Sequence, residues 1–145
     1  MKILRYQAKF SQEKKGFSIS FPDLPGCFSS AKTIEEAFSN AREALDLYLE
    51  EALDPDWKIP ESHEKKGKDY FWIVPSPEIS IPLTIRELRE KAKLSQPEMA
   101  RRLNMKVQQY QKLEYPHKSN PTTKSLMAVA ESLGYEVEFV KKKGA

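Results

Sequence analysis

Glutamine and lysine side chains crowd a short stretch in the last third of the chain, at Gln108, Gln109, Gln111 and Lys112. A glutamine amide can make two hydrogen bonds with the edge of adenine, and a lysine can reach guanine or a phosphate. Gln108 and Gln111 are three residues apart, so they share one face if the stretch is helical. The chemistry that this group of residues indicates is the reading of DNA bases.

Residue types that catalyse reactions or bind metals are few and lie far apart in the sequence. Cys27 is the single cysteine, and with no histidine close to it in the sequence we expect a small buried residue rather than a nucleophile. His63 and His117 are the two histidines, and neither has an evident metal-binding neighbour. Asp23 lies in a turn rich in proline and glycine, where aspartate commonly stabilises the turn itself. We therefore expect no catalytic residue, no metal and no cofactor.

The composition is typical of a folded protein with an uneven distribution of charge. The 145 residues are 39% hydrophobic and 31% charged. Residues 1–80 have a net charge of −3 and residues 81–145 one of +6, which favours a basic partner for the first part and a polyanion for the second. No stretch approaches the ~20 apolar residues that a membrane span needs, and residues 1–10 lack the apolar core of a secretory signal. These features, with the single cysteine, predict a cytoplasmic protein.

A proline-rich segment divides the chain. Five of the ten prolines lie between residues 54 and 82, between two parts with regular apolar patterns. We predict two domains, residues 1–80 and residues 81–145. Each would bury only a small core, so we also expect a homo-oligomer, either a dimer or a tetramer.

The first part has strand patterns around one helix. Thr33 and Glu36 form a capping box, and apolar residues then recur at helical spacing as far as Ala52. The opposite side of this helix is expected to be solvated. Its acidic residues include Glu43, Asp46 and Glu50. Alternating, β-branched or aromatic residues predict strands on both sides of the helix, over Lys2–Phe10, Phe17–Phe21, Cys27–Ala31 and Tyr70–Val74. The order β-β-β-α-β favours a helix packed on one antiparallel sheet, as the first half of an α+β protein.

The second part has the patterns of four helices, over Thr84–Lys93, Ser95–Leu103, Val107–Glu114 and Thr123–Leu133. In the first of these helices the apolar residues form one stripe. We expect Arg86 and Arg89 to lie outside this stripe, on the side that faces solvent. Ser95 and Glu98 form a second capping box. Asn104 falls where the chain must turn sharply, and asparagine tolerates the left-handed conformation that such a turn can require.

The segment Tyr135–Val140 alternates apolar and polar residues, which predicts a strand with no partner nearby in the sequence. An unpaired strand edge invites pairing with another chain. We expect this strand to pair across a two-fold axis and to dimerise the C-terminal domain. The alternative is that it folds back on its own chain.

Two short helices joined by a turn of about three residues can place the second helix in the DNA major groove. Roughly residues 84–134 resemble the lambda-repressor/Cro-like helix-turn-helix family, on residues 94–105 and on the pairs Leu113-Glu114, Asn120-Pro121 and Leu133-Gly134. The chain departs from the family at Asn104, usually glycine, and at Lys106, usually Ser or Thr. Together with the residue types, the resemblance implies DNA-binding residues Gln96, Lys106, Val107, Gln108, Gln109, Gln111, Lys112, Lys118 and Asn120. A plain helical bundle with a solvated polar face is the alternative.

The first part resembles the HicB antitoxin family. The matching pieces are Phe21–Cys27, Thr33–Ala37 and Asn40–Leu45, ahead of the helix-turn-helix pattern. The resemblance implies a partial RNase H-like fold, a HicA-type mRNA-cleaving toxin as partner, and repression of the shared operon. With the acidic charge of this half, we take Asp23, Glu43, Asp46 and Glu50 as candidate toxin-binding residues.

Two alternatives remain at this point. An RNase H-like fold raises the possibility of a metal-dependent nuclease, but such enzymes need several converging carboxylates, and the predicted strands have no inward acidic residue. The other alternative is a stand-alone transcriptional repressor whose N-terminal domain senses a small ligand. A short gene for a basic protein beside this one would favour the antitoxin.

Overall fold

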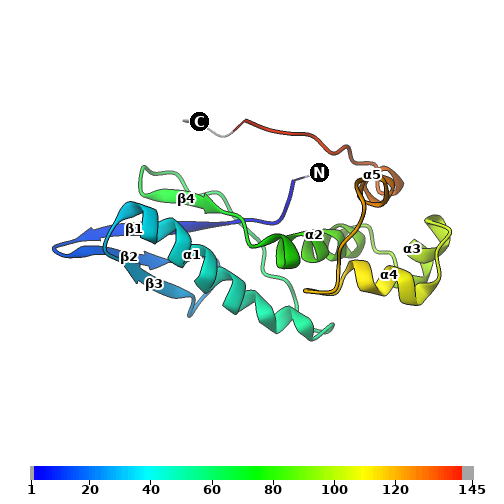
Figure 1. The fold of residues 1–145 in the computed structure, drawn as a ribbon, viewed down its shortest axis with the longest axis horizontal. Helices are drawn as coiled ribbons and strands as arrows, with labels where there is room; N and C mark the ends of the chain where they lie inside the picture. The colour runs from blue at the N-terminus through cyan, green and yellow to red at the C-terminus, as the bar shows by residue number, and fades with distance from the viewer. Residues whose placement is uncertain (1, 142–145) are drawn as a thin grey trace.

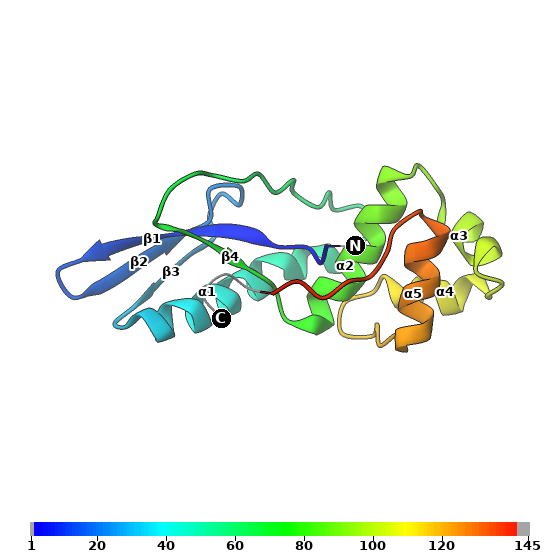
Figure 2. The same ribbon diagram turned by 90° about the horizontal axis from the view of Figure 1, so that it is seen from above.

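The computed structural model describes residues 2–141, which form an elongated molecule (Figure 1). A sheet and the long helix α1 make up one end, the short helices α3, α4 and α5 make up the other, and α2 lies between them (Figure 2). In chain order the elements are β1 (Tyr6–Glu13), β2 (Gly16–Ser20), β3 (Phe28–Ala31), α1 (Ile34–Leu49), the 3-10 helix η1 (Glu50–Leu53), β4 (Tyr70–Ile73), α2 (Pro77–Lys91), α3 (Gln96–Arg102), α4 (Val107–Leu113) and α5 (Thr123–Ser132).

The sheet is antiparallel throughout, in the order β3-β2-β1-β4, and α1 covers one of its faces. Alternate residues of β1 point to that helix, and Tyr6, Ala8 and Phe10 are buried. The Phe10 ring lies 5.0 Å from the Phe38 ring of α1 and 4.8 Å from the Phe71 ring of β4, measured between centroids. The predicted β-β-β-α-β order and the mixed α and β composition are therefore confirmed.

The first strand lies further along the chain than the alternation predicted. It begins at Tyr6, not at Lys2, and continues to Glu13. The backbone N–H of Leu4 donates to the hydroxyl of Thr84 at 2.8 Å, so the segment before the strand packs on α2 and does not extend the sheet. The following turn needs a glycine, because a Cβ on Gly16 would lie 2.2 Å from the carbonyl oxygen of Ala31.

Helix α2 begins at Pro77, seven residues before the predicted start at Thr84, and contains Pro82. A proline inside a helix has no N–H to donate to the carbonyl four residues earlier, which here is that of Glu78. The backbone N–H of His117 donates to this Glu78 oxygen at 2.9 Å. A residue from beyond α4 thus supplies the missing hydrogen bond, and the helix continues through the proline.

Two hydrophobic cores share α2. Ile79 and Leu83 belong to the core of the sheet and α1, whereas Ile85 belongs to the core of α3, α4 and α5. The boundary predicted between residues 80 and 81 falls inside this helix, and the division into two domains stays a prediction. None of the helices within residues 2–141 is long and apolar enough to span a membrane.

Arg86 was predicted on the outer side of its helix, but only 5% of it is exposed. Its guanidinium donates to the carbonyl oxygens of Ala52 at 3.3 Å and Pro55 at 2.9 Å, and also to that of Trp57. The same group pairs with Glu90 at 2.9 Å. The prediction failed because the chain leaving α1 packs across α2 at this point, which a pattern within one helix does not reveal.

The segment Tyr135–Val140 is not a strand within the described residues. It leads away from α5 as an extended chain (Figure 2), and Phe139 is fully exposed. The predicted strand pairing involves a second chain, and it stays a prediction.

Candidate functional site

Helices α3 and α4 are seven residues each and are separated by residues 103–106. The predicted capping box opens α3: the N–H of Glu98 donates to the Ser95 hydroxyl at 3.2 Å, and the N–H of Ser95 donates to the Glu98 carboxylate at 3.3 Å. Asn104 has a φ of 54°, the left-handed conformation that the sequence predicted for it. The turn is closed by the N–H of Met105, which donates to the Ala100 carbonyl at 2.9 Å. Asparagine therefore serves in this sharp turn without a glycine.

A buried carboxylate fixes α4 in place. Glu114, 5% exposed, accepts hydrogen bonds from the Arg89 guanidinium of α2 at 2.6 and 3.0 Å, and from the Gln96 amide of α3 at 3.2 Å. The Tyr110 hydroxyl also donates to it. Burial, followed by the nearby Glu114 charge, raises the pKa of Tyr110, so the phenol stays a donor. Because α2, α3 and α4 all contribute to this cluster, the outer face of α4 has one fixed orientation.

The face of α4 that points to solvent contains most of the residues expected to read DNA. Tyr110 and Leu113 point inward, and Val107, a predicted DNA contact, is partly buried against the same core. The exposed residues among those predicted to bind DNA are Lys106, Gln108, Gln109, Gln111 and Lys112 on α4 and at its start, with Lys118 and Asn120 in the loop that follows.

Some of these side chains already have partners within the chain. Gln96 donates to Glu114, so its amide helps to position α4. The side-chain oxygen of Gln109 accepts from the N–H of Lys106 at 3.1 Å, which is the half of a capping box that the third helical residue supplies. Lys106 has no acceptor to supply the other half, which a Ser or Thr hydroxyl usually provides. The Lys118 ammonium lies 4.8 Å from the centre of the Tyr115 ring. The side chain of Gln108 has no such intramolecular role in the described structure.

Gln111 is less accessible than Gln108 from one side. It lines a hollow of about 250 Å³, of which Leu53 and Pro55 at the end of η1 form part of the wall. The connection from the first half of the chain therefore lies beside α4. We expect Gln108, nearer the start of the helix, to be the better placed of the two for base contact.

The residues predicted to bind a toxin do not form one solvated acidic face. The Asp46 carboxylate accepts from the N–H of Ser76 at 2.9 Å and also from its hydroxyl. Glu50 lies 2.6 Å from Nε2 of His117. Both acids bind segments that fold back on α1, and their contact with a toxin stays a prediction. Glu43 remains exposed.

Asp23, the other candidate, ties a turn to the long connection before β4. Its carboxylate accepts from the N–H of His63 at 2.7 Å and lies 3.5 Å from the Lys65 ammonium. Burial alone would raise the pKa of Asp23, but the hydrogen bonds from His63 and the charge of Lys65 outweigh it and lower the pKa. Asp23 therefore has a structural role in this chain, and its contact with a toxin stays a prediction.

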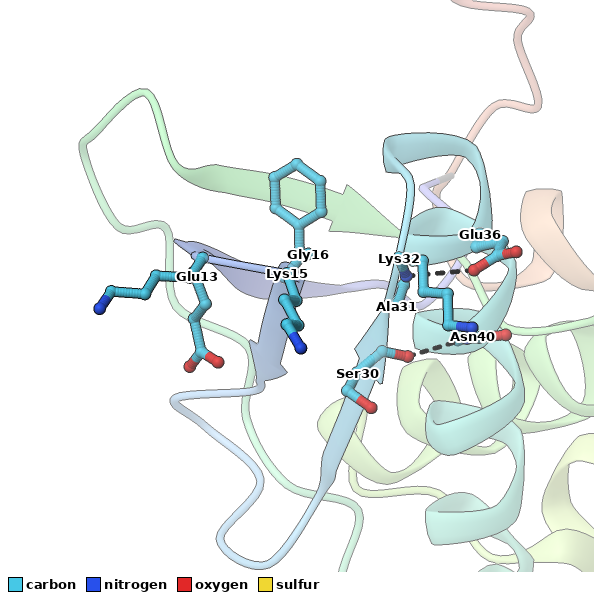
Figure 3. Close-up of a pocket in the computed structure, with 10 residues that line it drawn as sticks. Glu13, Lys15, Gly16, Ser30, Ala31, Lys32, Glu36 and Asn40 are labelled. Atoms are coloured by element: carbon cyan, nitrogen blue, oxygen red, sulfur yellow. Dashed lines mark hydrogen bonds between the residues drawn. The ribbon is translucent and has the colours of Figure 1, made fainter.

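A hollow of about 850 Å³ lies between the β1–β2 hairpin and the start of α1 (Figure 3). Figure 3 shows Lys32 donating its backbone N–H to Glu36, and Asn40 reaching the Ser30 carbonyl. The hollow is wide open to solvent, and its polar groups hold the end of the sheet to the helix. This arrangement has no nucleophile and base in contact.

The described residues provide no metal site or reactive thiol. Within residues 2–141 no group of three or more His, Cys, Asp or Glu side chains could hold a metal ion. Burial raises the pKa of the Cys27 thiol to about 11, which keeps it protonated and unreactive near neutral pH.

Sequence reasoning missed Arg89 and Glu114, which both lie next to apolar stripe positions of their helices. Arg89 and Glu114 have opposite charges and lie at the edges of the apolar stripes of α2 and α4. This combination is a signal that could have suggested an ion pair between the two helices.

Comparisons with known proteins identify relatives over most of the chain. Residues 7–120 match the family described as the HicB-like antitoxin of bacterial toxin-antitoxin systems. A 48-residue stretch is 44% identical to an uncharacterized 14.9 kDa protein of Haemophilus phage HP1, and it spans 33% of this chain but only 36% of the phage protein. Antitoxin HicB 2 of Photorhabdus laumondii is 28% identical over 77% of this chain and 78% of its own length. Antitoxin HicB of Escherichia coli K12 is 26% identical over 86% of this chain and 89% of its own length.

We expect Asp23→Asn to lower the free energy of unfolding by about 1 kcal/mol at neutral pH, the scale of a hydrogen bond to a charged group with partial compensation. A carboxylate with a lowered folded pKa stabilises the fold above its unfolded pKa, here the ordinary 3.8, and this stabilisation is lost as the pH falls through the folded value. The difference between the two proteins should therefore begin to shrink as the pH falls below 3.8, and it should be lost below the lowered folded pKa.

Urea unfolding followed by tryptophan fluorescence, repeated across a pH series, measures this difference. Glu64→Gln removes an exposed carboxylate from the same connection and is the matched control. An Asp23→Asn difference that persists unchanged at the acid end of the series would contradict the assignment.

Proposed function

We propose, since this chain belongs to the HicB-like antitoxin family, that it is the antitoxin of a type II toxin–antitoxin system. In this proposal it binds and neutralises a HicA-type mRNA-cleaving toxin through residues 1–80, and it represses its own operon through residues 81–145. It acts as a non-enzymatic regulator. The sheet with α1 would be a partial RNase H-like fold, and α3 with α4 a helix-turn-helix of the lambda-repressor/Cro type.

The observation that carries the DNA-binding part is the fixed outward face of α4. Its exposed glutamines lie between lysines, in the half of the chain with a net charge of +6. The buried Glu114 cluster fixes the orientation of this helix without using the Gln108 amide. A rigid polar helix in a basic surrounding suits entry into the major groove, where side chains can reach base edges.

We expect Gln108→Ala to relax the preference for particular base pairs, since a two-pronged contact with adenine contributes about 1–3 kcal/mol of discrimination. Lys118→Ala removes a charge that suits phosphate contact, so it should weaken binding to all DNA alike. It should also flatten the salt dependence by about one unit of slope. Gln111→Ala should behave like Gln108→Ala with a smaller effect, because of the neighbouring η1 segment.

Affinities for the operator and for random DNA, measured across a salt series, distinguish these two classes of variant. The operator is taken from the region upstream of the gene itself. If the glutamine variants weaken both DNAs equally, α4 is not the element that reads the sequence.

The toxin-binding part rests on the family and on the acidic charge of residues 1–80. Glu43 is the candidate acid that remains exposed. We expect Glu43→Lys to slow association with a basic HicA-type toxin by about threefold to tenfold at low salt, because complementary charges speed encounter. The effect should shrink at 1 M salt, where the screening length is about 3 Å.

Stopped-flow mixing with the purified toxin measures the association rate. Glu64→Lys changes the net charge equally from the connection before β4, and it should have the smaller effect. Equal rates for the original chain and Glu43→Lys at low salt would reject the electrostatic argument. Failure of the purified pair to co-elute in gel filtration would reject toxin binding itself.

The proposed assembly is a dimer, or a tetramer built from dimers, joined through the C-terminal half. The extended segment Tyr135–Val140 exposes apolar side chains, and a strand edge of this kind can pair across a two-fold axis. Removing residues 135–145 should therefore produce monomers by light scattering at micromolar concentration. A truncated protein that still dimerises fully would exclude this segment as the dimer interface.

A further inference from the structure

One face of the sheet is covered by α1, and the strand register places a different set of side chains on the other face. Lys9 of β1 pairs with Ser20 of β2 and with Tyr70 of β4, and Ser20 pairs with Phe28 of β3. Directly paired residues point to the same face of a sheet. Phe28, Ser20, Lys9 and Tyr70 therefore form one row across all four strands, which we call the cross-sheet row.

The cross-sheet row is exposed at two of its four positions. Phe28 is 70% exposed and Lys9 is exposed, while Ser20 and Tyr70 are partly buried. The connection before β4 covers the neighbouring position of the same face, where the N–H of Lys65 donates to the amide oxygen of Gln7, a buried residue. The backbone of Gly67 lies against one side of the Tyr70 ring, since a Cβ there would lie 3.0 Å from Cδ2 of that ring. Tyr70 is thus held in place and stays partly exposed.

The charge on this face is positive, although residues 1–80 as a whole are acidic. The Arg5 guanidinium lies 4.4 Å from the centre of the Trp72 ring, next to the cross-sheet row. The alternation places two cations on this face, Arg5 and Lys9, and one acid, Glu13, which lies at the hairpin end of β1 opposite Gly16. The cross-sheet row itself has a cation and no acid, which favours an anionic partner there.

We propose that this open face binds single-stranded RNA. Unpaired bases can stack on the exposed Phe28 ring and on the partly exposed Tyr70 ring, and Lys9 between them, with Arg5 alongside, can contact the phosphates. The bases of a duplex already stack on one another, so they cannot use these rings. The face also has the hydroxyls of Ser11, Ser18, Ser20 and Ser30, which can donate to and accept from the 2′-OH of RNA.

The dimensions fit a short segment. Three inter-strand spacings of ~4.8 Å separate β3 from β4, so the two outer rings of the row lie about 14 Å apart. That separation accommodates a few extended nucleotides, with Lys9 between the two stacked ends. This RNA site is separate from α4 and from the toxin interface proposed above, so either proposal can fail without the other.

Fluorescence anisotropy of a labelled 12-nucleotide oligouridylate, titrated with the full chain, tests the site. We expect Lys9→Glu and Phe28→Ala each to weaken binding by about tenfold, through the loss of a phosphate contact and of a stacking platform. Both residues are exposed, so the variants should fold, which circular dichroism checks. Lys32→Glu and Leu47→Ala are matched controls, because they remove an exposed charge and an exposed apolar side chain elsewhere. Both controls should bind as the original chain does.

The basic C-terminal half could also attract the oligonucleotide, so Lys112→Glu is measured in parallel. The proposal is overturned if Lys112→Glu abolishes binding while Lys9→Glu leaves it unchanged. It is also overturned if Lys9→Glu and Phe28→Ala impair toxin binding but not RNA binding, since the face would then be a protein interface. A 12-nucleotide oligothymidylate that binds as tightly as the oligouridylate would overturn the assignment to RNA.

Discussion

A charged side chain that leaves water must find partners, and α2 has two such arginines one helical turn apart: Arg86 is buried, and the Arg89 side chain is 13% exposed. Arg86 donates to carbonyl oxygens of the chain that leaves α1. Arg89 pairs with Glu114, at the end of α4. One helix therefore binds the sheet half through one guanidinium and the α3–α4 pair through the other. Together with the two cores that share α2, these contacts hold the candidate DNA-reading face in its position relative to the sheet.

Much of the secondary structure follows from local chemistry, and the sequence predicted it for that reason. The Thr33 cap and the Ser95 capping box mark the starts of α1 and α3 where the structure has them, although Glu36 accepts from the N–H of Lys32 and not from that of Thr33. Asn104 occupies the left-handed turn that its residue type allows. The errors in the predicted element boundaries lie where contact with a segment distant in the sequence sets the boundary. The start of α2 depends on a hydrogen bond that the loop after α4 provides to the helix, and the start of β1 depends on a bond to Thr84.

In the candidate sites too, the sequence predicted the features that depend on local pattern and missed those that depend on long-range contacts. The sequence predicted an exposed Gln and Lys face on α4, because helical spacing separates that face from Tyr110 and Leu113. It could not predict that the Gln96 and Gln109 amides serve the fold, or that Asp46 and Glu50 bind segments far along the chain, since these bonds join residues that only the tertiary structure brings together. The cross-sheet row was missed for a related reason. Alternation identifies the apolar face of each strand, but only the register shows which residues of the other face meet.

The sharing of α2 between two cores limits how such a protein can evolve by exchanging parts. Recombination at the midpoint of the helix would separate Ile79 and Leu83 from Ile85, and it would separate Pro82 from the loop residue that compensates for it. A viable crossover would have to fall before Pro77 and bring with it both arginines and the loop after α4. Even then Arg86 would need a new partner segment that presents its carbonyl oxygens in the same arrangement. The two halves are thus expected to be inherited together more often than a chain of independent modules would be.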